Sequence, residues 1–275
     1  MAGQTVNDEP VVEELDEVWA SVLEACQELP DDEWDQPTDC PGWTVKDNLS
    51  HLIGVERMLL GDPAPEAPAE APPHVRNTIG EVNEAWVAAR RDVPGQDVLA
   101  EFADTTYRRI TVLRELPPEK FDEIGPSPTG MAPYREFMDT RVMDSWAHEQ
   151  DIRRALDRPG GRNGAGERVS LERCAKAMPF VVGKKVAPPD GTTVLFAVNG
   201  VLGTHLAVGV DGGRAAVLDP PPADPTVTLA MDQEAYWRLG FGRVEPLDLL
   251  ASGAVVMTGD ESLGRAVLAA MPFMI

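Results

Sequence analysis

The feature that most constrains the fold of this chain is a change in hydrophobic period at a glycine-rich segment. Before residue 157, apolar residues recur at every third or fourth position, which places them on one face of an α-helix. Beyond the segment, short runs rich in Val, Leu and Thr alternate with turns, a pattern typical of β-strands. The segment itself, DRPGGRNGAGER at 157–168, contains four glycines and one proline. The sequence therefore predicts two domains, a helical one over 9–157 and a mixed one over 168–275.

The N-terminal domain is predicted to be a four-helix bundle with one long connection. Helical patterns cover 11–29, 45–60, 76–92, 97–116 and 134–156, and the third main helix would bend around Val93-Pro94-Gly95. Thr44 and Asp47 fit the capping-box pattern at the start of the second helix. Two proline-rich stretches, 62–73 and 117–133, are expected to be loops.

The C-terminal domain is predicted to be a small α+β fold. Its expected strands are TTVLFAV, THLAVGV, RAAVLD, TVTLAM and AVVMTGD, and its expected helices lie near 169–182, 232–240, 245–252 and 261–271. The turn Asp211-Gly212-Gly213 lies between two alternating runs and indicates a β-hairpin.

The charge of the chain excludes several classes of partner. Lys and Arg total 24 against 46 Asp and Glu, so the formal net charge is −22. Such a surface repels phosphate backbones and anionic lipid, so we expect neither nucleic acid nor a membrane as partner. No run of about 18 apolar residues is present, and the acidic N-terminus lacks the basic and apolar regions of a secretory signal. We therefore expect a cytoplasmic protein.

Two of the four histidines are candidate metal ligands. His51 lies near the apolar face of the second helix, and His148 lies in the last helix with Asp144 four residues before it, on the same face. A catalytic Zn²⁺ takes imidazole nitrogens and carboxylate oxygens from three protein ligands and keeps one position open, and facing helices of a bundle supply such sets. On spacing alone, solvated or core histidines remain the commoner explanation. His74 is expected to face solvent, and His205 to be structural or exposed.

Other reactive or polar residues have simpler explanations. The cysteines, Cys26, Cys40 and Cys174, are widely spaced, which argues against a disulfide framework or a cysteine zinc site. Cys40 is either redox-active or a small residue packed in a Pro-Gly turn.

The aromatic and acidic neighbours of the histidines are also assigned to structure. The tryptophans, Trp43 among them, are expected in the core. Glu149 and Asp151 are expected to point away from His148, and Asp151 either supports a neighbouring group by a hydrogen bond or pairs with Arg154 on the surface.

Two stretches of the chain resemble a known family. WDQPTDCPGWTVKDNLSHL at 34–52 resembles the N-terminal signature of the mycothiol-dependent maleylpyruvate isomerases, in the DinB-like metal-binding superfamily, and RVMDSWAHEQDIRRAL at 141–156 resembles their fourth-helix segment. The C-terminal half is similar to their appended, sterol-carrier-like α+β domain. The resemblance implies a DinB-like bundle in which His51, Asp144 and His148 hold one divalent metal, with Zn²⁺ the first candidate. The carboxylate of that family is commonly Glu, and Asp144 is shorter by one methylene.

The resemblance also implies an activity. Mycothiol would be the thiol cosubstrate, ionised at the metal, and the sulfur would attack a small electrophile. Addition to a double bond, rotation and release give an isomerase, whereas a stable adduct gives a thiol transferase. Arg238 and Arg243 are the candidate catalytic residues that would bind substrate carboxylates, and ordinary surface arginines are the alternative. Two rival functions remain: a non-catalytic protein that binds metal or an apolar ligand, and a metal-dependent hydrolase of a thiol conjugate. The oligomeric state is left open.

Overall fold

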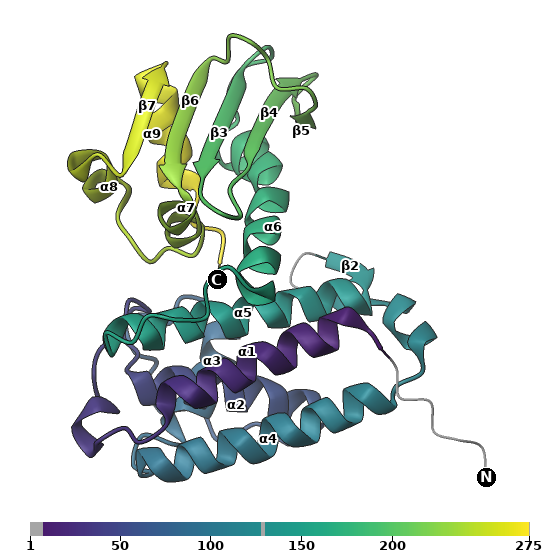
Figure 1. Ribbon diagram of the computed structural model, residues 1–275, viewed down its shortest axis with the longest axis vertical. Coiled ribbons are helices and arrows are strands. Elements are labelled where there is room, and N and C mark those ends of the chain that lie inside the picture. The colour runs from purple at the N-terminus through teal and green to yellow at the C-terminus, as the bar shows by residue number, and fades with distance from the viewer. Residues whose placement is uncertain (1–7, 128–129, 275) are drawn as a thin grey trace. The chain divides into compact units, whose positions relative to one another are not determined.

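The computed structural model describes residues 8–127 and 130–274, which fall into two compact units divided after Val169 (Figure 1). Four long helices build the N-terminal unit: α1 (Pro10–Cys26), α2 (Val45–Leu59), α4 (Gly95–Glu115) and α5 (Tyr134–Ala155). Helix α1 packs against α4 and α5, and α2 packs against the same two helices, so that each helix has two neighbours in the bundle. The large apolar side chains between them are fully buried, among them Trp19, Leu49, Leu52, Phe102 and Trp146. The predicted four-helix bundle is confirmed.

One predicted bend is instead a complete break. Helix α3 (Thr78–Ala88) and helix α4 are separate, and Pro94 occupies the position just before α4. Proline lacks a backbone N–H and therefore cannot continue the hydrogen-bond ladder of a helix. As a result α3 lies against α2 as an additional helix, outside the ring of four.

A capping box fixes the start of helix α2, as the sequence predicts. The Thr44 hydroxyl accepts a hydrogen bond from the backbone N–H of Asp47 at 3.2 Å, and the Asp47 carboxylate accepts one from the backbone N–H of Thr44 at 3.1 Å. Both bonds satisfy N–H groups that the first turn of a helix leaves without a partner. The cap sets the position from which His51 projects two turns later.

The stretch 117–133 contains regular elements at 118–122, 124–127 and 130–133, although the sequence predicts a loop. It contains a 3₁₀ turn, η2 (Pro118–Asp122), and an antiparallel hairpin of β1 (Ile124–Ser127) and β2 (Gly130–Pro133) that pairs Ile124 with Pro133. Strands of four residues that contain proline and glycine carry no alternating pattern, so composition could not reveal them.

The C-terminal unit is a five-stranded sheet with helices, in the strand order β5-β4-β3-β6-β7. The strands are β3 (Thr193–Asn199), β4 (His205–Asp211), β5 (Arg214–Leu218), β6 (Val227–Asp232) and β7 (Val255–Gly259). Among these described strands only the β3–β6 pair is parallel. The other elements are helix α6 (Ala165–Phe180), the π-helical turn η3 (Val181–Val186), α7 (Gln233–Gly240), α8 (Pro246–Ser252) and α9 (Glu261–Ala270). This mixed architecture agrees with the predicted α+β class.

Helix α6 begins inside the predicted linker. Gly166 is buried, and a Cβ atom added to it would lie 2.7 Å from both Val18 and Trp146. Gly166 therefore allows close packing rather than chain flexibility, and a sequence alone does not distinguish these two reasons for a glycine. Among the described residues, none of the helices has both the length and the apolar character needed to cross a bilayer.

Candidate metal centre

Helices α2 and α5 bring His51, Asp144 and His148 together. One nitrogen of each imidazole and one carboxylate oxygen lie within 4.8 Å of one another. The Nε2 atom of His51 is 3.2 Å from Oδ2 of Asp144, the Nε2 atom of His148 is 3.7 Å from Oδ1, and the two ring centroids are 4.7 Å apart. Both histidines are buried, whereas the Asp144 side chain is 16% exposed. The centre thus opens to solvent on the side of the carboxylate.

The orientation of the His148 ring is fixed from behind. Its Nδ1–H donates to Oδ1 of Asn48 at 2.6 Å, and Oδ2 of Asp151 lies 3.3 Å from the same nitrogen. The Asn48 amide nitrogen donates in turn to the Thr38 hydroxyl and to the Thr44 carbonyl. With Nδ1 occupied, Nε2 faces Asp144, which is the usual arrangement of a metal-binding histidine.

The position of Asp151 corrects one expectation. Its side chain is fully buried and faces His148, rather than pointing away from that ring or lying on the surface. Arg154 pairs with Asp39 at 2.9 Å instead. The offset of three residues on the helix permitted either arrangement, and burial favours the one that supports the imidazole.

The His51 ring has an unused nitrogen. Among the described residues, its buried Nδ1 atom has no hydrogen-bond partner. Burial lowers the pKa of His51 below its usual value, and the opposing charge of Asp144 only partly offsets this effect. The ring is therefore neutral at neutral pH, which is the form that coordinates a metal.

The Asp144 carboxylate is ionised. Burial disfavours its charge, but the Arg141 guanidinium and the neighbouring His51 outweigh burial and hold the pKa of Asp144 well below its usual range. Two imidazoles and one ionised carboxylate form a donor set that suits a divalent ion such as Zn²⁺. The residues present therefore fit the group that the resemblance implies.

A buried charge network that the sequence does not predict lies next to Asp144. Arg141 donates to Asp144 at 2.7 Å and to Glu56 at 2.8 Å, and Arg109 donates to the other oxygen of Glu56 at 3.0 Å. Residues 141, 144 and 148 share one face of α5, so the spacing of Arg141 was a usable signal. Nothing in the sequence marks Glu56 as buried, because its partners lie 53 and 85 positions away.

An aromatic wall lies beside the two imidazoles. The ring centroid of Trp43 is 5.0 Å from that of His51 and 5.7 Å from that of His148. The indole N–H donates to the buried carboxylate of Glu84 at 3.2 Å, and Trp43 is only half-buried rather than a core residue as expected. The aromatic signal was present in the sequence, but its place beside the histidines was not.

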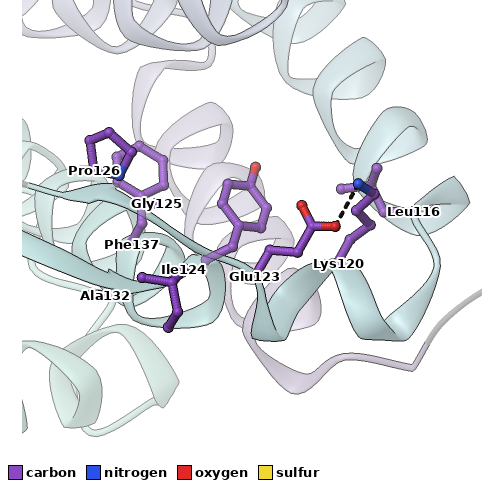
Figure 2. Close-up of a pocket in the computed structure, with 9 residues that line it drawn as sticks. Leu116, Lys120, Glu123, Ile124, Gly125, Pro126, Ala132 and Phe137 are labelled. Atoms are coloured by element: carbon purple, nitrogen blue, oxygen red, sulfur yellow. Dashed lines mark hydrogen bonds and ion pairs between the residues drawn. The ribbon is translucent and has the colours of Figure 1, made fainter.

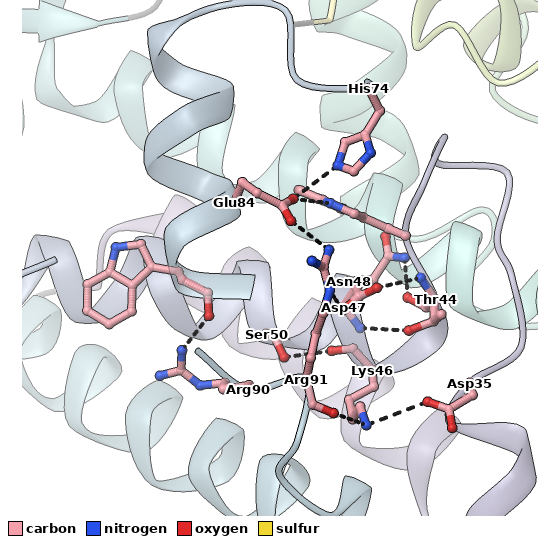
Figure 3. A network of polar contacts seen from close by, with 12 residues as sticks. Asp35, Thr44, Lys46, Asp47, Asn48, Ser50, His74, Glu84, Arg90 and Arg91 are labelled. Atoms are coloured by element: carbon pink, nitrogen blue, oxygen red, sulfur yellow. Dashed lines mark hydrogen bonds and ion pairs between the residues drawn. The ribbon is translucent and has the colours of Figure 1, made fainter. Parts of the chain in front are cut away.

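His74 is also held in place, which corrects its expected exposure to solvent. Figure 3 shows His74 and Arg91 converging on Glu84: His74 donates to Oε2 at 3.0 Å, and Arg91 forms an ion pair with Oε1 at 2.6 Å. A Cβ added to Gly42 would lie 2.3 Å from the His74 ring. The end of the proline-rich loop is therefore fastened to the turn that carries Trp43.

The three cysteines differ in their surroundings. Cys26 and Cys174 are buried, and burial raises the pKa of both thiols, that of Cys26 to about 12, so neither is a reactive thiolate. Cys40 is half-buried, and its sulfur lies within 4.8 Å of ligand atoms of His148 and Asp151. Its sulfur thus lies beside the candidate centre, and its role stays a prediction.

The candidate arginines belong to the C-terminal unit. Arg238 lies in α7 and its Nη2 donates to the carbonyl of Arg243 at 3.4 Å, while Arg243 donates to the carbonyl of Phe241 at 2.9 Å. The two are thus neighbours at the end of one helix, and their role toward a substrate stays a prediction.

A pocket of about 250 Å³ lies elsewhere on the N-terminal unit (Figure 2). It is bounded by the β1–β2 hairpin, including Ile124 and Ala132, and by Phe137 at the start of α5. Lys120 and Glu123, which form an ion pair at 2.6 Å, line its edge. None of the three candidate ligands lines it.

Two curated proteins and two crystal structures are similar to this chain. An uncharacterized protein from each of two strains of Mycobacterium tuberculosis is 32% identical over 131 residues, 46% of this chain. That match spans about half (49%) of the length of these relatives. A crystal structure of the mycothiol-dependent maleylpyruvate isomerase, 14% identical, covers 90% of this chain and 92% of its own at a TM-score of 0.53. A histidine-to-alanine mutant of that enzyme, 13% identical, gives the same coverage and TM-score.

The fold is therefore that of the maleylpyruvate isomerase. A sterol carrier protein domain of Helicoverpa armigera also aligns, over 42% of this chain, at a TM-score of 0.31. Two family models together match most of the sequence. Residues 15–153 match the mycothiol maleylpyruvate isomerase N-terminal domain, and residues 168–266 match the MDMPI C-terminal domain. The chain belongs to the mycothiol-dependent maleylpyruvate isomerase family.

Proposed function

We propose that this chain is a metal-dependent, mycothiol-dependent isomerase or thiol transferase that acts on a small electrophile. The observation that carries the proposal is the convergence of His51, Asp144 and His148 from two helices, with ligand atoms within 4.8 Å. Membership of the family supports mycothiol as the thiol. The side chains of this centre, two imidazoles and one ionised carboxylate, would hold the ion.

Each neighbouring residue has a defined part in this proposal. When bound, a divalent ion supplies the positive charge that favours the ionised form of a thiol near neutral pH. Asn48 and Asp151 keep the His148 ring turned toward Asp144. Trp43 covers one side of both imidazoles and keeps water from them, so that thiol and substrate approach from the exposed side of Asp144.

The chemistry proposed for the thiol balances without a further reactant. The ionised sulfur adds to a conjugated carbon–carbon double bond, a C–S bond forms, and the electron pair moves onto the carbonyl oxygen. Rotation about the resulting single bond and loss of the sulfur regenerate the thiolate and give the isomer. A transferase instead protonates the carbon and releases the adduct. In either case we propose that Arg238 or Arg243 pairs with a carboxylate of the substrate.

The first test is the metal content of the purified chain and of His51→Ala, His148→Ala and Asp144→Asn, measured by elemental analysis. Replacement of His205, which is exposed in the C-terminal unit, by Ala is the matched control. We expect about one divalent ion per chain in the parent and the control, and less than about a tenth of that in the three ligand variants. Equal metal content in all five proteins would show that His51, Asp144 and His148 do not form a metal centre.

The second test separates the candidate reactions. The metal-loaded chain is incubated with mycothiol and a cis-configured unsaturated keto acid, and products are followed by NMR. A trans product with the thiol recovered indicates an isomerase, and a stable thioether indicates a transferase. Cleavage of an added mycothiol conjugate by water indicates the hydrolase, and bound metal without any reaction indicates a binding protein.

A further inference from the structure

We infer that Arg141 is a positioning residue that fixes the Asp144 carboxylate for the metal, and that the buried Glu56 anchors it. This inference rests on the proposed function, because it assumes a metal at the centre. It concerns residues beside the ligand set rather than the ligands themselves. In this proposal the affinity and coordination geometry of the ion depend on the Arg141 guanidinium, which acts through Asp144 and is not itself a metal ligand.

The anchor is a carboxylate held at both oxygens. Glu56 is fully buried, and its Oε1 atom accepts from Nε of Arg141 at 2.8 Å while Oε2 accepts from Nε of Arg109 at 3.0 Å. Arg109 is itself fixed by a hydrogen bond to the Tyr134 hydroxyl at 2.7 Å. Glu56 therefore cannot rotate without breaking a buried ion pair.

Arg141 transmits this rigidity to the ligand. Its Nη1 atom donates to Oδ2 of Asp144 at 2.7 Å, the same oxygen that accepts from His51 at 3.2 Å. With Oδ2 held on two sides, Oδ1 is left facing His148. Because a guanidinium is planar and has several fixed donors, it can set the plane of a carboxylate, which a lysine ammonium cannot do.

The cost of this arrangement argues that it serves the centre. Arg141 is 5% exposed, and its Nη2 atom has no hydrogen-bond partner among the described residues. A buried charged group with an unpaired donor is a poor way to stabilise a fold. The same arrangement is useful when the short side chain of Asp144 must be held in one orientation.

A purely electrostatic role would have the opposite effect on metal binding. The charges of Arg109, Glu56, Arg141 and Asp144 sum to zero, so the arginine next to the ligand reduces the negative charge that attracts a cation. If charge alone mattered, removal of Arg141 would tighten metal binding. If Arg141 positions Asp144, its removal weakens metal binding. The sign of the change therefore decides between the two.

The experiment compares the parent with Arg141→Gln and Arg141→Lys. Zn²⁺ affinity is measured by competition with a chromophoric chelator, and the visible spectrum of the Co²⁺-loaded protein reports coordination geometry. We expect Arg141→Gln to bind Zn²⁺ about 10–100-fold more weakly, with an altered Co²⁺ spectrum, and Arg141→Lys to restore neither.

The matched control is Arg153→Gln. Arg153 is a buried, ion-paired arginine of the same helix that bonds Glu149 at 2.7 Å and does not touch the centre. We expect this variant to keep the affinity and spectrum of the parent. Circular dichroism compares the folding of all variants, and if Arg141→Gln is not folded, Arg141→Lys alone decides.

Three outcomes overturn the inference. Arg141→Gln that binds Zn²⁺ as tightly as the parent, or more tightly, with an unchanged Co²⁺ spectrum shows that the arginine does not position the ligand. Full recovery in Arg141→Lys shows that an ammonium donor suffices and that the planar guanidinium does not set the orientation of the carboxylate. Metal-free parent protein overturns the proposed function as well, whereas the first two outcomes leave that function standing.

Discussion

Replacement of Glu56 by Gln tests whether the charge network beside the candidate metal centre holds the bundle together. The substitution keeps the shape of the side chain and removes only the charge, so no cavity forms. The carboxylate is fully buried and forms ion pairs at 2.8 Å with Arg141 and 3.0 Å with Arg109. Removal of one partner of a buried ion pair costs about 3–5 kcal/mol, because the other charge remains without compensation. Here Arg141 keeps its ion pair with Asp144, whereas Arg109 loses the carboxylate of Glu56, and we expect at least about 3 kcal/mol.

The assay is urea unfolding of the full chain, followed by circular dichroism at a helical wavelength. A loss of about 3 kcal/mol corresponds to a change on the order of 100-fold in the unfolding equilibrium. The matched control is Glu13→Gln, because Glu13 pairs with Arg114 at 2.9 Å but is 57% exposed. An exposed pair contributes about 0–1 kcal/mol. If the two variants lose the same small free energy, the buried network does not stabilise the bundle and the reasoning is refuted.

Three further predictions address the surroundings of the centre. Trp43→Phe removes the N–H that donates to the buried carboxylate of Glu84 at 3.2 Å, so we expect a loss of about 1.5–3 kcal/mol in urea unfolding. Because the folded-state pKa values of Asp144 and His51 are both lowered, the unfolded chain binds more protons on acidification. The free energy of unfolding of the metal-free protein should therefore fall below about pH 6.5. His51→Gln should reduce that fall between about pH 6.5 and 5. An unchanged dependence on pH would contradict the lowered pKa of His51. In Gly54→Ala the new Cβ would lie 2.4 Å from the Trp86 side chain of α3, so overpacking should cost about 1–3 kcal/mol in the free energy of unfolding, more than the gain in helix propensity. Gly80→Ala, whose Cβ would lie 3.5 Å from its nearest neighbour, should raise the free energy of unfolding by up to about 1 kcal/mol.

The elements that could be predicted from the sequence are those with a local cause. The start of α2 follows from Thr44 and Asp47, which are three residues apart, and the strands of the C-terminal unit follow from alternation within each run. The paired strands β1 and β2 have no such cause, because both are short and contain proline and glycine. The sequence places Gly166 in a linker, because it does not distinguish a flexible glycine from one that allows a neighbouring helix to approach closely.

The candidate site divides along the same line. The ligand set was inferred from a resemblance and from helical spacing, and the structure brings His51, Asp144 and His148 together. The groups around them depend on contacts between distant positions. His148 bonds Asn48 across 100 residues, and Glu56 is paired across 53 and 85. Spacing within one helix cannot reveal such partners, because it defines a face but not what packs against that face.

The stretch 34–52 acts on both imidazoles, although it contains only one of them. His51 projects from it directly, and Trp43 lies over the rings of both His51 and His148. Asn48 donates to the carbonyl of Thr44, which belongs to the helix cap, and accepts the ring N–H of His148 from the facing helix. A shift of the cap would therefore move one ligand and turn the other. The turn with Trp43, the cap with Thr44 and the ligand His51 therefore depend on one another's spacing within this segment. Helix α5 needs only to present Asp144 and His148 on one face.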